Sequence, residues 1–205
     1  MPESLPDIYP REEQIVFNCL IGEAIARWAS VEYGLALIVG ASLNSINAST
    51  ALFKIENFRS KLAFTKMAFD LSDKCAPFAT EAAAVFATAQ GLSGVRNDIA
   101  HSRVVVFSAA PPGRQFAIVP LFAKENDRQN RKLPPSGSYC VSDLDLARQQ
   151  FGTVASALQS LCSRIVGDTD LFAERAQLKP RLQTPAQLRR HYLEELPQRG
   201  RSPRE

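Results

Sequence analysis

Apolar residues recur at alternating intervals of four and three along the first long stretch of the chain, which predicts one face of an α-helix over residues 11 to about 46. That face consists of Ile21, Ile25, Trp28, Glu32, Leu35 and Val39. Glu32 is the exception, because it places a carboxylate where the pattern requires an apolar side chain. A charged group in a buried stripe needs a partner.

Two further helices are predicted by the same spacing. The polar segment "ASLNSINAST" ends the first helix, and Asn47 or Ser49 is expected to cap a second helix over about 50–73. A third helix begins near Pro77, a residue suited to a first helical turn, and continues to about His101. Its apolar face, in which an arginine is the charged exception, runs through Val85, Ala89, Leu92, Arg96 and Ile99.

The pattern then changes to two β-type runs, "RVVVFS" (103–108) and "QFAIVPLF" (115–122), on either side of "AAPPG". Such runs around a turn rich in proline and glycine predict a β-hairpin or ribbon, and "YCV" (139–141) is expected to return as a short strand. A last helix should begin at a Ser142 cap, with Asp145 completing a variant of the capping box. Heptad spacing gives this helix an apolar face that must be buried, made of Leu144, Ala147, Phe151, Val154, Leu158, Leu161 and Ile165.

These elements predict a mainly α-helical protein, an up-down bundle of about four long helices with a small β-hairpin or ribbon between the third and fourth. One domain is expected over residues 11–167, with the β insertion at about 103–141. Residues 168–205 are expected to form a basic, partly disordered tail, which from Glu174 to Glu205 has eight Lys or Arg against four Glu. This excess favours either an anionic partner or a solvated, disordered end.

The composition narrows the classes of function only slightly. The 205 residues carry a formal net charge of +3, too small on its own to argue for nucleic acid. Four cysteines stand far apart in the sequence, so no zinc site or cofactor is expected and the thiols should be reduced. The first residues, "MPESLPDIYPREEQ", lack the features of a signal peptide, and the apolar run "LALIVGA" is too short to span a bilayer. We therefore expect a cytoplasmic protein that does not enter a membrane.

Chemically useful side chains gather near the end of the third predicted helix, in "VRNDIAH". Asn97 and His101 are four residues apart and share a helix face, which extends back to Ser93 and Gln90. Arg96 starts on the apolar side, and its side chain is long enough to swing toward the helix end. Histidine exchanges protons near neutral pH, and arginine presents a fixed fork of donors to phosphate oxygens. No carboxylate cluster of the kind that binds Mg²⁺ accompanies them, so cleavage of a phosphodiester is expected to be metal-independent, with the RNA 2′-hydroxyl as nucleophile.

A structural interpretation of the same residues is open. His101 near a helix C-terminus interacts favourably with the helix dipole as a cap. Arg96 and Glu32 are the matching charged exceptions in two apolar faces, and a buried ion pair between them would join the two helices. Spacing alone favours this role, because an arginine five residues before a histidine is common by chance.

The stretch "VRNDIAHSRV" resembles the R-x4-6-H motif of HEPN domains (higher eukaryotes and prokaryotes nucleotide-binding), including the polar Asn97 after the arginine. "AIARWASVEYGLALIV" and "IENFRSKLAFTKMAF" resemble the first two helices of bacterial HEPN-like proteins, so the resemblance covers about residues 15–103. It implies a metal-independent endoribonuclease that works as a homodimer and leaves a 2′,3′-cyclic phosphate. In that role His101 would transfer protons, Arg96 would bind the scissile phosphate and Asn97 would support both. The further supporting residues are expected to be Glu32, Gln90 and Ser93.

The resemblance also implies RNA as the substrate, a role of the toxin or defence type, and an antitoxin or another protein as a partner. The chain departs from the family pattern at Ser102, where a glycine often follows the histidine. Some members of the family are non-catalytic. The sequence therefore leaves two hypotheses: an endoribonuclease, or a helical interaction or RNA-binding module in which the motif is structural.

Overall fold

A computed structural model describes residues 11–107, 110–112, 114–119, 134 and 137–167. The chain divides into two units, Met1–Ile165 and Val166–Glu205. Beyond Gly167 the second unit, and with it the predicted basic tail, lies outside the described residues.

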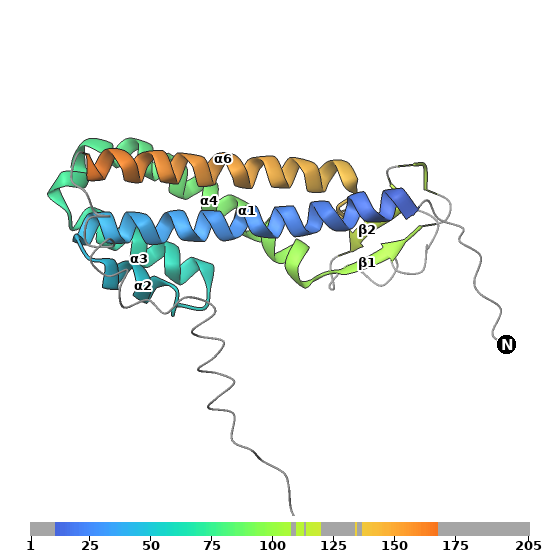
Figure 1. Cartoon of the computed structure of the whole chain (residues 1–205), viewed down its shortest axis with the longest axis horizontal. Coiled ribbons are helices and arrows are strands. Elements are labelled where there is room, and N and C mark those ends of the chain that lie inside the picture. The colour runs from blue at the N-terminus through green and yellow to red at the C-terminus, as the bar shows by residue number, and fades with distance from the viewer. Residues whose placement is uncertain (1–10, 108–109, 113, 120–133, 135–136, 168–205) are drawn as a thin grey trace, which may run out of the picture. The chain divides into compact units, whose positions relative to one another are not determined.

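The protein is mainly α-helical with a small two-stranded antiparallel sheet, as the sequence predicts (Figure 1). In chain order the described elements are α1 (Arg11–Leu43), α2 (Ile46–Leu52), α3 (Phe58–Asp70), the 3₁₀ helix η1 (Asp73–Phe78), α4 (Ala79–His101), β1 (Arg103–Val106), β2 (Phe116–Val119) and α6 (Val141–Val166).

The first predicted helix is confirmed but ends slightly early, at Leu43. Asn44 takes a left-handed conformation, with a φ of 48°, which stops the helix. Ser45 then caps α2, because its side chain accepts a 3.2 Å hydrogen bond from the backbone N–H three residues later. The cap predicted at Asn47 or Ser49 is therefore wrong, since both residues lie inside α2.

The second predicted helix, over 50–73, is interrupted. A turn at residues 53–57 separates α2 from α3. Asn57 caps α3 by accepting a 2.7 Å hydrogen bond from the backbone N–H of Ser60. The turn lets the chain begin a new helix in a new direction.

α3 runs in the same direction as α1. Its first residue, Phe58, lies against Trp28 in the middle of α1, with ring centroids 4.7 Å apart. One turn further along both helices, Lys61 of α3 forms an ion pair with Glu32 of α1. Later residues of α3 thus contact later residues of α1, so the two helices run parallel. The short α2 and the turn after it bring the chain back to the middle of α1 before α3 begins.

α6 also runs in the direction of α1, and α4 runs in the opposite direction. Glu81, near the start of α4, forms an ion pair with Arg164 near the end of α6. Asp98, near the end of α4, accepts a hydrogen bond from Tyr139, just before α6. The end of α4 therefore lies beside the start of α6.

The predicted β-hairpin is confirmed. β1 and β2 pair antiparallel in four residue pairs that begin with Arg103↔Val119. The predicted return at "YCV" is present as a single bridge between Tyr139 and Ile118. All four residues of β2 are buried, so the hairpin contributes its second strand to the core.

The apolar face predicted for the last helix is confirmed, because all seven of its residues are buried in α6. Its predicted cap is wrong. Ser142 lies inside α6, and the first turn is closed by Asp143, whose Oδ2 accepts a 2.9 Å hydrogen bond from the backbone N–H of Cys140. This is the backward half of a capping box with Cys140 as the N-cap, two residues before the predicted Ser142. Asp145 instead accepts hydrogen bonds from Arg148.

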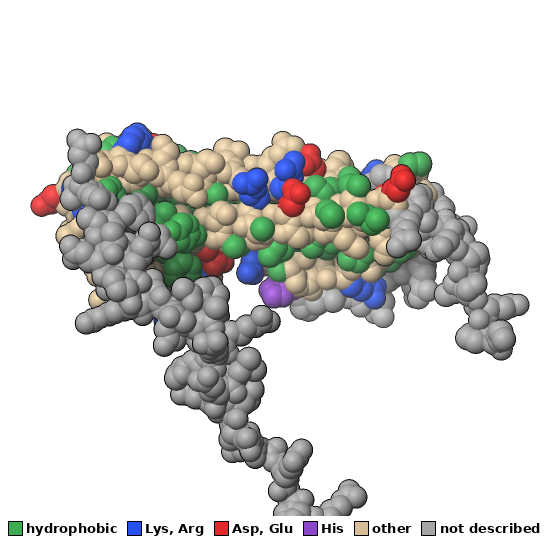
Figure 2. Space-filling model, viewed as in Figure 1, with side chains coloured by type: hydrophobic (Ala, Val, Ile, Leu, Met, Phe, Trp, Pro, Cys, Tyr) green, Lys and Arg blue, Asp and Glu red, His purple; other side chains and the backbone are tan. Residues whose placement is uncertain are grey.

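α1 is long and apolar enough to cross a membrane by length and composition alone, but 56 % of its apolar window is buried inside the fold. Packing against the neighbouring helices accounts for that apolar character. Hydrophobic side chains also reach the surface along α1 (Figure 2), including Ile15 and Val16 in its first turns, which are 53 % and 50 % exposed.

Close packing of α1 against α6 depends on a glycine. A Cβ atom added at Gly34 would lie 2.7 Å from the Cβ of Leu158, so the two helices approach more closely than any larger residue permits. On the same helix Gly22 is exposed, and a Cβ added there would meet nothing within 4 Å.

Replacing Gly34 with alanine is expected to lower the free energy of unfolding by about 1–3 kcal/mol, because the added methyl group overpacks the contact with Leu158. The matched change Gly22→Ala should raise that free energy by roughly 0.5–1 kcal/mol through helix propensity alone. Urea denaturation followed by the fluorescence of the single tryptophan, Trp28, measures both changes. Equal effects of the two substitutions would contradict this account of the helix contact.

Candidate functional site

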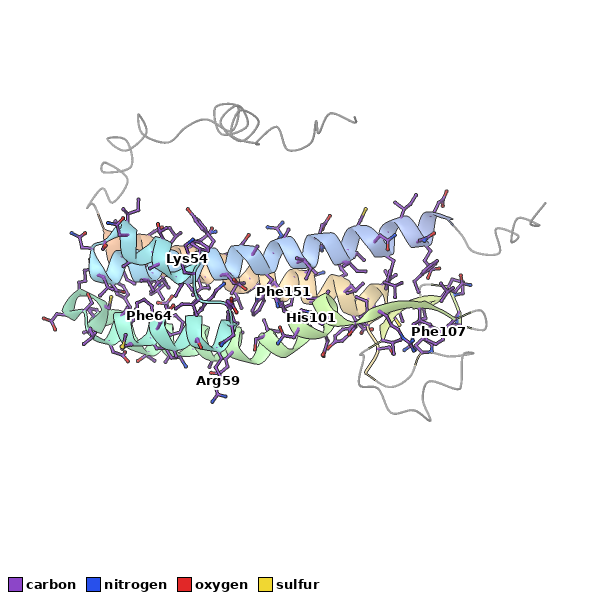
Figure 3. All side chains as sticks on the ribbon, turned by 90° about the horizontal axis from the view of Figure 1, so that it is seen from below. Lys54, Arg59, Phe64, His101, Phe107 and Phe151 are labelled. Atoms are coloured by element: carbon purple, nitrogen blue, oxygen red, sulfur yellow. The ribbon has the colours of Figure 1, made fainter. Side chains whose placement is uncertain are left out.

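His101 is the last residue of α4 and stands where the helix passes into β1 (Figure 3). The helix stops there because Ser102 takes an extended conformation, while its N–H still donates to the backbone oxygen of Asp98. The imidazole is exposed and makes no hydrogen bond with any residue that the structure describes. No described residue therefore competes with a ligand for the imidazole.

A cleft of about 470 Å³ opens beside this helix end. It is lined by α4, by α1, and by the loop before α3 together with the first residues of α3. The lining residues are Ser93, Arg96, Asn97 and His101 from α4, Glu32 from α1, and Glu56, Asn57, Phe58 and Arg59 from the turn and α3.

Arg96 does not pair with Glu32, so the ion pair predicted between them is wrong. Its Nη1 instead donates a 3.1 Å hydrogen bond to the Oδ1 of its neighbour Asn97. Its Nε is buried and has no hydrogen-bond partner among the described residues. Arg96 thus lines the same cleft as Glu32 and His101 but keeps unused donor capacity.

Glu32 is held by two other residues. Lys61 of α3 forms an ion pair with its Oε2, and the indole Nε1 of Trp28 donates a 3.0 Å hydrogen bond to its Oε1. The side chains of Lys61 and Glu32 are only 10 % and 18 % exposed, so both charges are largely removed from water. Sequence reasoning missed Lys61, although it lies three residues after the half-buried Phe58 and one before a buried leucine, in the apolar face of α3.

The polar strip predicted along the third helix is only partly gathered at the cleft. Ser93, Asn97 and His101 line it, whereas Gln90 is exposed and lies outside the lining. The Ser93 hydroxyl donates a 2.7 Å hydrogen bond to the backbone oxygen of Gln90, back along the helix. Among the predicted supporting residues, Ser93 and Glu32 therefore border the cleft and Gln90 does not.

Asp98, the acidic residue inside the motif, has a structural contact that the sequence did not reveal. Its Oδ2 accepts a 2.9 Å hydrogen bond from the hydroxyl of Tyr139. Burial, and then the hydrogen bond to Asp98 and the charges of Asp98 and Asp143, raise the pKa of Tyr139 to about 12. This contact fixes the last turn of α4, and with it the position of His101, against the segment that precedes α6.

The wall of the cleft that faces α4 contains two charged side chains that were not predicted as site residues from the sequence. Glu56 lies in the turn before α3, and Arg59 lies in the first turn of α3, from which its side chain extends outward (Figure 3). Both are exposed, and neither forms an ion pair or hydrogen bond with another described residue. Because Lys61 pairs with Glu32, the lining residues that carry a charge without an ion-pair partner among the described residues are Arg59, Arg96 and Glu56.

Among the described residues, no group of three His, Cys, Asp or Glu side chains lies close enough together to hold a metal ion. The four cysteines are free thiols, three of them buried.

In comparisons with known protein families, with curated proteins and with solved structures, nothing matches this chain. The resemblance to HEPN domains therefore rests on the sequence alone, that is, on the motif near the end of a long helix and on the two stretches within residues 15–103 that precede it.

Breaking the Lys61–Glu32 pair should destabilise the fold. Lys61→Met removes the cation from the mostly buried Glu32 carboxylate, which keeps only its hydrogen bond from Trp28. We expect the free energy of unfolding to fall by about 1–3 kcal/mol. Removing both charges in Lys61→Met/Glu32→Leu should recover part of that loss. The exposed Lys54→Met serves as the control. Chemical denaturation measures all of these variants, and a double variant no more stable than the single one would contradict this role of the pair.

The raised pKa of Tyr139 predicts a pH dependence. Its folded pKa of about 12 exceeds the ordinary value of 10.0, so its stabilising contribution is present below pH 10 and is lost as the pH rises toward 12. Over that window the free energy of unfolding of the wild type should fall more steeply than that of Tyr139→Phe. Denaturation curves at a series of alkaline pH values test this, and parallel slopes would contradict it.

Proposed function

We propose that this protein is a metal-independent endoribonuclease of the HEPN type, in which the RNA 2′-hydroxyl attacks the phosphorus and leaves a 2′,3′-cyclic phosphate. The observation that carries the proposal is that one cleft is lined both by His101, which is exposed and has no partner among the described residues, and by Arg96, whose Nε has no acceptor among them. The resemblance of "VRNDIAHSRV" to the R-x4-6-H motif supports the same chemistry. The finer architecture proposed with it is a helical bundle of that family, in which an up-down order holds only if the short α2 is counted as the return segment between the parallel α1 and α3.

Arg96 would bind the scissile phosphate. Its Nη1 is already held by Asn97, which orients the guanidinium, and its Nη groups would donate to phosphate oxygens that enter the cleft. Asn97 is therefore a positioning residue. As the attacking O2′ forms its bond to phosphorus and the bond to O5′ breaks, the guanidinium neutralises charge that builds up on the phosphate oxygens.

His101 would transfer protons in this reaction. It is the last residue of α4 and lines the cleft, and no described residue forms a hydrogen bond with its ring. Imidazole both takes and gives protons near neutral pH, and a positioned group of this kind contributes about 10²–10⁴-fold to a rate. Resemblance supports a homodimer, in which a second copy of His101 is one source of the other proton-transfer group, and the exposed apolar residues at the start of α1 offer a surface for such a contact.

The role proposed for the activity is of the toxin or defence type, with an antitoxin or other protein as its partner and the cytoplasm as its location. It is supported by the family resemblance alone. A non-catalytic RNA-binding or interaction module is the second candidate, because the Arg96–Asn97 hydrogen bond gives each of these side chains a partner within the helix. In that case Arg96→Ala should lower the stability without any activity to lose.

Wild-type protein is expected to cut single-stranded RNA in the presence of EDTA and to leave 2′,3′-cyclic phosphate ends. His101→Ala should lower the cleavage rate by about 100-fold or more, because it removes a proton-transfer group. Gln90→Ala, on the same helix but outside the cleft, is the matched control and should cut normally. Product ends are identified by mass spectrometry, and circular dichroism checks that the variants fold.

Two results would contradict the proposal. One is wild-type protein that cuts RNA no faster than His101→Ala. The other is a product with 5′-phosphate ends, which belongs to a metal-dependent nuclease and not to attack by the 2′-hydroxyl.

A further inference from the structure

Cleavage of RNA by its own 2′-hydroxyl needs two proton-transfer groups. One takes the proton from the 2′-oxygen as that oxygen attacks, and the other gives a proton to the 5′-oxygen as it leaves. His101 is one of them in the function proposed above, on which this inference rests. Two carboxylates, Glu32 and Glu56, line the same cleft and are the other titratable groups in its walls that commonly exchange protons.

Glu32 is unsuited to the task. Its two oxygens are occupied by the Lys61 ammonium group and by the Trp28 indole N–H, and the side chain is only 18 % exposed. Both contacts hold the carboxylate against α3 and within α1. A carboxylate in that position keeps the helices together and has no free oxygen for a substrate proton.

Glu56 has the opposite surroundings. It is exposed, it lines the cleft, and it makes no hydrogen bond or ion pair with any other described residue. Its backbone is nevertheless held in place, because the next residue, Asn57, caps α3 through its 2.7 Å bond to the Ser60 N–H. The residue after that, Phe58, packs on Trp28 at 4.7 Å.

The facing wall is held equally well. The hydrogen bond from Tyr139 to Asp98 ties down the last turn of α4 one residue before the buried Ile99. His101 and Glu56 are thus presented by two anchored segments on different walls of one cleft, each with a free side chain. Placing reacting groups on fixed elements is what makes proton transfer to a bound substrate efficient.

We infer that Glu56 is the second proton-transfer group of this site, so that one protomer contains a complete pair. The Glu56 carboxylate takes the 2′-hydroxyl proton while O2′ forms its bond to phosphorus. The bond from phosphorus to O5′ breaks, and the protonated His101 ring gives its proton to O5′. Solvent then removes the proton from Glu56 and returns one to His101. Arg59 and Arg96 line the two walls of the cleft, and among the described residues neither forms an ion pair, so both are available to bind the phosphate.

The test compares Glu56→Gln with the wild type on single-stranded RNA in EDTA. The amide keeps the shape of the carboxylate but cannot take a proton, so kcat should fall by about 100-fold or more while KM changes little. Glu56→Asp, which keeps a carboxylate, should retain part of the rate. Glu12→Gln, an exposed glutamate in the first turn of α1, is the matched control and should leave the rate unchanged.

A second measurement asks whether both groups belong to one protomer. His101→Ala and Glu56→Gln are co-expressed with different tags and purified through both, so that any oligomer contains both chains. No mixed assembly should recover activity, because each chain lacks one member of its own pair. Recovery to a substantial fraction of the wild-type rate would mean that the two groups come from different chains, and it would overturn the single-protomer site.

The outcomes separate this inference from the proposed function. If Glu56→Gln cuts RNA as fast as the wild type while His101→Ala does not, the ribonuclease proposal stands and Glu56 is not the second group. A second copy of His101 would then be the remaining source. If the wild type itself cuts no faster than His101→Ala, the ribonuclease proposal and the role of Glu56 fail together.

Discussion

The ion pair between Lys61 and Glu32 determines where α3 lies on α1, and the cleft depends on that placement. Each charge stands in an otherwise apolar helix face, so sliding one helix along the other would leave two mostly buried charges unpaired. One turn earlier, the contact of Phe58 with Trp28 agrees with the same register. Together these contacts fix the turn before α3, which forms the wall that faces the end of α4.

The sequence predicted the parts of the fold that have long, regular patterns. The apolar face of α6 and the hairpin are examples. An apolar residue at every third or fourth position is typical of a helix, and two β-type runs beside a proline-rich turn are typical of a hairpin. It failed where several local choices were equivalent. Ser45, Asn47 and Ser49 are all good caps, and only the left-handed Asn44 decides among them. The break at 53–57 has a capping residue, Asn57, inside a run that was otherwise consistent with one helix.

The candidate site was predictable along one helix and not across helices. Helical spacing placed Asn97 and His101 together, and both line the cleft. Spacing gave no information about which helices are neighbours, and three charged residues occupy apolar positions. The spacing predicts Arg96 as the partner of Glu32. The partner of Glu32 is instead Lys61, because α3 runs parallel to α1 and brings Lys61 next to Glu32. The facing wall could not be found for the same reason, since it joins α4 only through the tertiary fold.

Among the described residues the buried Nε of Arg96 has no acceptor, which supports the proposal that the motif is more than a helix end. Leaving the Nε of Arg96 without an acceptor costs roughly 1–3 kcal/mol, more than an apolar residue in the same stripe would. A purely structural arginine would be expected to reach Glu32, which lines the same cleft, yet Glu32 is already satisfied by Lys61 and Trp28. Local choices that oppose stability tend to occur where a ligand completes them. A phosphate between Arg96 and His101 would draw the guanidinium into the cleft, where its Nε would gain an acceptor, and the cost to the free protein would then be returned as affinity for the group that the site is proposed to cut.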